Sequence, residues 1–140
     1  MISKMLMVLL MLVGSYISFS NTPQELEEVK VVKKFSPVYP PLARVANISK
    51  KVVVEVEIDK DGTVQTTRVR EGHPLLNKAS EQTAKKWTYS SSECDVENRK
   101  STIIFSFKIM PDGTNEKDLK PVFIPPNEFE IRTVIPLIQY

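Results

Sequence analysis

The side chains able to perform chemistry are few in this chain and far apart in its sequence. His73 is the only histidine and Cys94 the only cysteine. A histidine-based metal site or a histidine-activated nucleophile therefore has few residues to draw on, and an enzyme would need a pocket that contains His73 and Cys94 together. Four carboxylates share one short stretch: Glu55, Glu57, Asp59 and Asp61. Such groups bind Ca²⁺, but Lys60 stands inside the loop and the later glutamate of a calcium loop is missing.

We therefore interpret the acidic stretch as a charged hairpin tip, and we expect no catalytic residue, no cofactor and no metal ion. His73 lies between Gly72 and Pro74 and is expected to be a loop residue. Cys94 has no partner for an internal disulfide, and its polar neighbours favour a tolerated loop cysteine. Pairing between two chains and a reactive thiol are the alternatives. This inventory points away from an enzyme and towards a binding protein.

Length and composition fit one small soluble domain. The 140 residues are enough for a single core, and 41% hydrophobic with 26% charged residues is typical of globular proteins. The formal net charge of +2 offers no cluster of cations for several phosphate contacts, so we do not expect nucleic acid as a partner.

The first twenty residues have the pattern of a secretory signal peptide. Lys4 precedes the apolar run Met5–Val13, and Ser18 and Ser20 place small side chains before a cleavage site at Asn21. The apolar run is shorter than the roughly 20 residues that span a bilayer. We expect export with cleavage before Asn21, and an uncleaved membrane anchor is the alternative. Residues 21–35 form a lead-in segment, either mobile or ending in a short edge strand.

The elements that follow are predicted from spacing. Pro37 and Pro40-Pro41 begin a short helix in which Leu42, Val45 and Ala46 share one face. Residues 51–59 alternate as a half-buried strand, with Val52, Val54, Val56 and Ile58 on one face. A tight turn at 59–62 leads to a second strand at 63–70. A bulge near Thr66-Thr67 would turn both of its valines inward.

A second helix and two more strands complete the pattern. The helix covers Leu75 to Trp87, with a buried stripe formed by Leu76, Ala79, Thr83, Ala84 and Trp87. We interpret Trp87 as a core residue. Residues 100–110 alternate as a third strand, and Glu128 to Ile135 alternates again as a fourth.

The order of these pieces resembles the C-terminal domain of the TonB family over residues 36–110. The residues that carry the resemblance are Tyr39-Pro40, Ala43-Arg44, the valine-rich strand, Asp61-Gly62-Thr63-Val64, Leu76, Ala79, Ala84-Lys85-Lys86-Trp87 and Phe105-Ser106-Phe107. The resemblance implies an α+β fold in which two helices pack on one face of a three- to four-stranded antiparallel sheet. Residues 111–140 would then be a C-terminal extension with an extra strand.

The resemblance also implies a periplasmic module, associated with transmembrane transport, that binds an extended segment of an outer-membrane receptor or another periplasmic protein by strand addition. It points to the third strand as the docking edge, with Arg44 nearby, where family members can carry a glutamine. The residues expected to bind the partner are Arg44, Ile103, Ile104, Phe105, Ser106, Phe107, Lys108 and Ile109.

Several alternatives stay open at this point. A solitary secreted interaction or scaffold domain is the second functional class, a homodimer is a second mode of association, and an inner-membrane anchor facing the periplasm is a second location. The run Glu128 to Ile135 adds a hypothesis: if it pairs with the third strand, it occupies the edge that a partner would use. Deleting the chain from Pro125 onward would then tighten binding.

Overall fold

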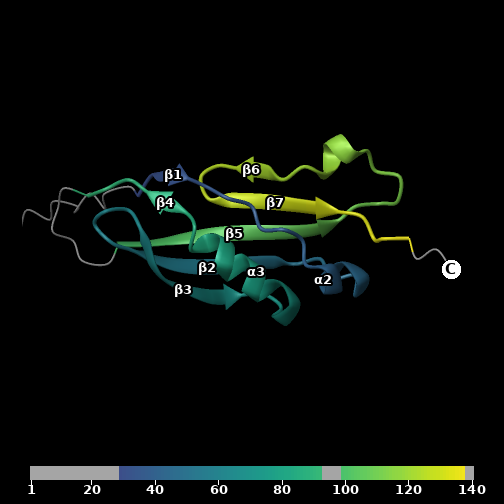
Figure 1. Cartoon of the computed structure of the whole chain (residues 1–140), viewed down its shortest axis with the longest axis horizontal. Helices are drawn as coiled ribbons and strands as arrows, with labels where there is room; N and C mark the ends of the chain where they lie inside the picture. Colours follow the sequence, from purple (N-terminus) through teal and green to yellow (C-terminus); the bar gives the residue numbers. More distant parts are fainter. Residues whose placement is uncertain (1–28, 93–98, 138–140) are drawn as a thin grey trace, which may run out of the picture.

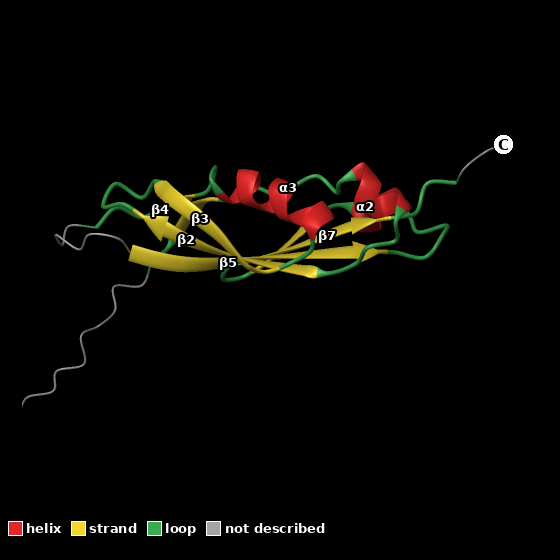
Figure 2. Ribbon diagram, turned by 90° about the horizontal axis from the view of Figure 1, so that it is seen from below, coloured by secondary structure: helices red, strands yellow, loops and turns green. Residues whose placement is uncertain are grey.

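A computed structural model of the chain describes residues 29–92 and 99–137. Two helices lie on one face of a twisted sheet, and the other face of the sheet is open (Figures 1 and 2). The elements in chain order are β1 (Val31–Lys33), α2 (Pro41–Val45), β2 (Lys51–Ile58), β3 (Val64–Glu71), α3 (Pro74–Ala84), β4 (Thr88–Tyr89), β5 (Arg99–Ile109), the 3₁₀ helix η1 (Glu116–Leu119), β6 (Val122–Ile124) and β7 (Glu128–Thr133).

The main sheet has five strands in the order β3-β2-β5-β7-β6, and β1 pairs with β4 in a separate two-stranded sheet. All pairs are antiparallel except β5 and β7, which run parallel. The predicted α+β class and the two helices on one face are confirmed. The sheet is wider than expected because residues 110–127 turn back through β6, so that β7 returns beside β5 in the same direction.

The β2–β3 hairpin follows the predicted alternation. The inward side chains of β2 (Val52, Val54, Val56 and Ile58) are fully buried. In β3 the register shifts leave Gln65 and Arg70 without direct partners. The extra residue at Gln65 places Val64 and Val69 on the core side. The bulge predicted near Thr66-Thr67 has the same consequence for the two valines. The prediction was therefore right in kind and slightly displaced in position.

The short helix α2 packs through a different face from the predicted one. Ala43 is fully buried, whereas Leu42 and Val45 are 70% and 62% exposed. The prediction of a packed Leu42/Val45/Ala46 face is wrong because a single turn lying close to the sheet admits only a small side chain. Tyr39 supplies the bulk, and its hydroxyl donates to the carbonyl of Ile48 after the helix.

Helix α3 runs from Pro74 to Ala84, so the prediction that it extends to Trp87 is wrong. His73 precedes the helix as its N-cap, and its Nδ1 accepts a hydrogen bond from the Leu75 amide at 3.1 Å. The loop position predicted for His73 is thus confirmed. Ser80, which the predicted stripe omits, is fully buried. Its hydroxyl donates to the Leu76 carbonyl at 2.9 Å, so the buried polar group has a partner. Ala79 is only partly buried.

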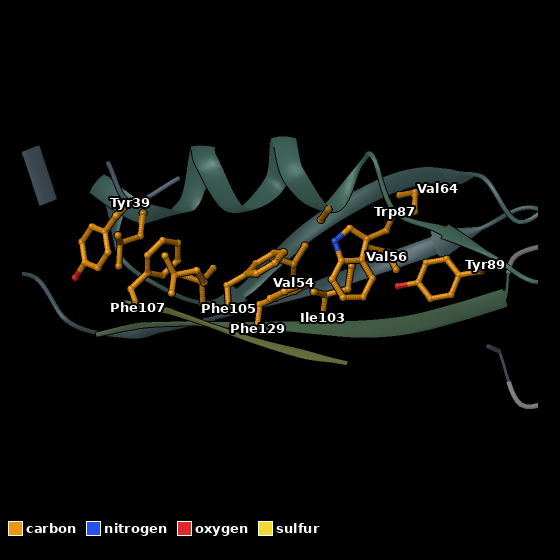
Figure 3. Packing of buried hydrophobic residues seen from close by; sticks show 14 of the residues in the cluster. Tyr39, Val54, Val56, Val64, Trp87, Tyr89, Ile103, Phe105, Phe107 and Phe129 are labelled. Atoms are coloured by element: carbon orange, nitrogen blue, oxygen red, sulfur yellow. The ribbon is translucent and has the colours of Figure 1, made fainter. Parts of the chain in front are cut away.

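Trp87 is a core residue, as predicted, and is fully buried among other hydrophobic side chains (Figure 3). Its ring lies 6.1 Å from Phe105 and 6.0 Å from Phe129, centroid to centroid, both edge to face. Its Nε1 donates to the Phe35 carbonyl at 2.9 Å, which fixes the lead-in across this part of the core. One aromatic side chain therefore joins β5, β7 and the lead-in.

None of the helices within residues 29–92 and 99–137 has the length and apolar character to cross a bilayer. The predicted signal peptide, most of the lead-in and Cys94 lie outside the described residues.

Candidate functional site

Both edges of the predicted docking strand are paired in the structure. On one side β5 pairs with β2 from Arg99 to Ser106, and on the other it pairs with β7 from Ile104 to Ile109. Figure 1 shows β7 lying between β5 and β6. The hypothesis that the C-terminal run occupies the partner's edge is therefore matched by the pairing, and the docking role of β5 stays a prediction.

The predicted site residues of β5 divide between two faces of the sheet. Ile103, Phe105 and Phe107 point into the core and are buried. Ile104, Ser106 and Lys108 alternate onto the open face. Side chains of this second set are the ones that meet β7 outside the core.

On the open face, β7 presents two carboxylates to polar groups of its neighbours. Ser106 Oγ donates to Glu128 Oε1 at 2.6 Å, and Lys51 Nζ lies 3.6 Å from the same oxygen. Lys108 Nζ donates to Glu130 Oε2 at 2.7 Å. Arg132, on β7 itself, donates to the other oxygen of Glu130 at 2.6 Å. Hydrogen bonds from Lys108 and Arg132 hold the pKa of Glu130 below its usual value.

On the core face, β7 contributes Phe129 and Ile131, both buried. The Phe129 ring lies 5.1 Å from the Phe123 ring of β6. Lys34 Nζ of the lead-in lies 3.9 Å from the centroid of Phe123, over the ring. β7 is therefore held by apolar contacts from within and ion pairs from outside.

Arg44, the predicted site residue outside β5, lies at the point where β7 leaves the sheet. Its Nη2 donates to the carbonyl of Val134 at 3.2 Å. Its Nε is buried and has no hydrogen-bond partner. Arg44, Tyr39 and Thr133 help to line a shallow depression of about 330 Å³. The structure thus brings Arg44 to the end of the β5–β7 edge, and its role in partner binding stays a prediction.

The two outer edges of the sheet are poor templates for another strand. β3 carries two bulges and the charged residues Arg68, Arg70 and Glu71, and both features hinder edge pairing. β6 has three residues and lies between Pro121 and Pro125, which have no amide hydrogen to donate. Along β5, by contrast, an extended segment of six residues, β7, is already paired over Ile104–Ile109.

The acidic hairpin tip has a structural role. The carboxylate of Asp59 accepts hydrogen bonds from the backbone amides of Asp61 and Thr63 at 3.0 and 2.9 Å and from Gln65 Nε2 at 2.7 Å. These bonds, that from Thr63 first, hold its pKa below the usual value. In the described part of the chain, no three His, Cys, Asp or Glu side chains gather as metal ligands would.

The sequence did not reveal the ion pairs that join three strands, Lys51 of β2 with Glu128 of β7 and Lys108 of β5 with Glu130 of β7. The alternation of Glu128 and Glu130 was visible in the sequence, but the parallel register that sets them opposite Ile104 and Ser106, within reach of Ser106 and Lys108, was not. It depends on the path of residues 110–127.

Comparison with known proteins agrees with this geometry. Residues 36–110 match the family model described as the Gram-negative bacterial TonB protein C-terminal. A solution NMR structure of the Pseudomonas aeruginosa TonB CTD is similar, with 28% sequence identity and a TM-score of 0.50, covering 61% of this chain and 90% of that chain. No curated protein matches the chain. β6 and β7 follow the last residue that the family model matches.

Proposed function

Because this chain belongs to the family of TonB C-terminal domains of Gram-negative bacteria, we propose that it captures an extended segment of an outer-membrane receptor by strand addition along β5. Domains of this family are periplasmic protein-interaction domains that serve transport. The finer elements of the proposal are the edge that binds, the segment that is bound and the export of the chain.

The observation that carries the proposal is the parallel pairing of β7 with β5. β7 comes from outside the residues that match the family, yet it makes a six-residue ladder with β5 from Ile104 to Ile109. Main-chain hydrogen bonds give affinity to any extended segment that reaches such an edge. β5 is thus able to receive a strand, and an incoming segment recovers the ladder that a departing β7 gives up.

A reversible covalent lock tests whether β7 must leave. Ile104 and Glu128 are register partners in β5 and β7. Cysteines at both positions, in a Cys94→Ser background, should form a disulfide that abolishes binding of purified outer-membrane receptors, and reductant should restore it. Cysteines at Glu55 and Arg68, register partners in β2 and β3, are the matched control and should not affect binding. Full binding by the locked β5–β7 form would rule out strand addition at this edge.

The lock is a better test than deletion of the chain from Pro125 onward. Deletion removes Phe129 and Ile131, which are buried against the core, so a loss of binding would be confounded with unfolding. The prediction that the deletion tightens binding applies to variants that remain folded by circular dichroism.

We place the domain in the periplasm, exported by residues 1–20 with cleavage before Asn21. The supporting features are the short apolar run and the small residues at 18 and 20. Sequencing the amino terminus of the mature protein tests this: a start at Asn21 supports export with cleavage, and an intact Met1 supports a membrane anchor.

A solitary interaction or scaffold domain is the second candidate. One observation favours it: Val38, Leu42 and Val45, in and before α2, are exposed apolar side chains that do not pack into the core. Exposed apolar surface of this kind can bind another protein. Receptor capture that fails in both the locked and the reduced proteins, with other periplasmic proteins still bound, would favour this second class.

A further inference from the structure

The charges around β7 indicate what kind of segment fits its place. We propose that the segment captured along β5 alternates acidic and apolar side chains, with two carboxylates, two residues apart, facing Lys51 and Lys108. This inference rests on the strand addition proposed above and names the chemistry of its ligand.

The first step concerns the open face of the sheet. The carboxylates of Glu128 and Glu130 belong to β7, whereas Lys51 belongs to β2 and Lys108 to β5. When β7 leaves, both carboxylates leave with it and both lysines stay. The hydroxyl of Ser106 also loses its acceptor, because it donates to Glu128. The vacated edge therefore carries two cations and a hydroxyl donor without partners, which favours an acidic replacement.

The second step concerns the core face. Phe129 and Ile131 alternate with the two glutamates and are buried in the core. A replacement strand must refill this space, since an unfilled cavity beside Trp87 and Phe105 lowers stability. The parallel register pairs Ile104 with Glu128 and Ser106 with Glu130. The favoured ligand is thus acidic, apolar, acidic, apolar, running in the direction of β5.

Arg44 adds a third cation at the end of the β5–β7 edge. It donates to the Val134 carbonyl where β7 leaves the sheet, and its buried Nε has no partner. An acidic side chain on the captured segment at this point could accept a hydrogen bond from Arg44 Nε. The Val134 carbonyl accepts only from Nη2 and leaves Nε without a partner. The basic groups therefore follow the whole length of the edge.

Three synthetic peptides of equal length test the pattern on the full-length chain. Each follows residues 127–134, with glutamate, glutamine or lysine at both of the positions of Glu128 and Glu130. Within one protein the cost of displacing β7 is the same for all three, so the ratio of their Kd values reports the charge preference alone. Exposed ion pairs each contribute about two- to threefold. We expect the glutamate peptide to bind about tenfold more tightly than the lysine peptide at low salt, with a smaller ratio at high salt.

Lys108→Glu should remove or invert this preference, and Lys108→Gln should reduce it if the first variant folds poorly. Lys100→Glu is the matched control. It makes the same charge change on the same face of β5, but Lys100 lies before the residues that pair with β7. The control should keep the wild-type ratio.

The outcomes separate the two proposals. Equal binding of the three peptides, or an equal loss of preference in both charge variants, overturns the acidic pattern and leaves strand addition standing. Failure of every peptide to bind, while the cysteine-locked and reduced forms capture receptors equally, overturns strand addition and this inference with it.

Discussion

The two neighbours of β5 are attached to the domain in different ways. β2 continues directly into β3 through a tight turn, and Asp59 and Gly62 fix the shape of that turn. β7 is connected only through residues 110–127 and is flanked by the short strand β6. Helix α3 packs over β2 and β3, whereas the lead-in segment crosses the β7 side near Trp87.

Under the proposed strand addition, this contrast explains why β7 rather than β2 is the strand to be exchanged. The β2–β3 unit closes through contacts between residues close in sequence, which form at low entropic cost. β7 pairs locally with β6, but its ladder with β5 joins segments that are more distant in sequence, and this ladder is the contact that the proposed strand addition would replace. We therefore expect the β6–β7 side to open while the β2–β3 side remains folded.

The largest expected effect is common to both sides. Trp87→Ala removes the ring that contacts Phe105 and Phe129, and should lower the free energy of unfolding by about 3–5 kcal/mol. Chemical denaturation followed by circular dichroism measures it, with Trp87→Phe as a milder control. A loss below about 1 kcal/mol would contradict a core that depends on this residue.

The next prediction compares one truncation on each side. Ile58 in β2 and Ile131 in β7 are both buried, and replacing either with alanine should cost about 2–4 kcal/mol. The two variants should differ in which strands become less protected from amide hydrogen exchange. Ile131→Ala should accelerate amide hydrogen exchange mainly in β6 and β7, whereas Ile58→Ala should accelerate it throughout the sheet. Identical exchange patterns would mean that the two sides open together.

The same contrast shows what could be predicted from the sequence. The hairpin was predictable because Val52, Val54, Val56 and Ile58 alternate and a glycine-containing turn follows. Trp87 was predictable as core because a large aromatic side chain near a helix end is most often buried, although the helix itself ends at Ala84. These signals are local, and the residues that carry them also make the contacts.

The β7 side was only partly predictable. The alternation of Glu128 to Ile135 indicated a strand, but the strand ends at Thr133 and Ile135 is exposed. Its direction and register depend on the path of residues 110–127, which no periodic pattern encodes. The exposed face of α2 was not predictable for a related reason, because helical spacing identifies a shared face without showing how near the sheet will lie.

Two glycines with positive φ give a smaller contrast. A Cβ on Gly62, at φ 91°, would lie 1.9 Å from the carbonyl oxygen of Tyr89, whereas a Cβ on Gly113, at φ 83°, would meet nothing within 4 Å. Gly62→Ala should therefore cost about 2–3 kcal/mol. Gly113→Ala should cost about 1 kcal/mol, from backbone strain alone. Denaturation midpoints of the two variants measure the two losses of stability. Equal losses would show that the backbone around Gly62 shifts to accommodate the Cβ without cost.

The smallest expected effect is the pH dependence of the β7 ion pairs. Hydrogen bonds from Lys108 and then Arg132 lower the pKa of Glu130 in the folded protein. A depressed carboxyl pKa stabilises the fold fully above the unfolded pKa of about 4.3, and this contribution disappears as the pH falls through the folded value. Wild type should therefore exceed Glu130→Gln in Tm by about 2 °C at pH 6, and the difference should shrink as the pH falls below the unfolded pKa.

Glu55 provides the matched test on the β2–β3 side. A hydrogen bond from Arg70 lowers its pKa in the same way, so Glu55→Gln should show a Tm difference with the same dependence on pH. Of these two variants, Glu130→Gln alone should also raise hydrogen exchange in β7 at pH 6, because Glu130, unlike Glu55, connects β7 to β5. If Glu55→Gln released β7 equally, the charges would act on the stability of the whole sheet, and the exchangeable side would depend on its apolar contacts alone.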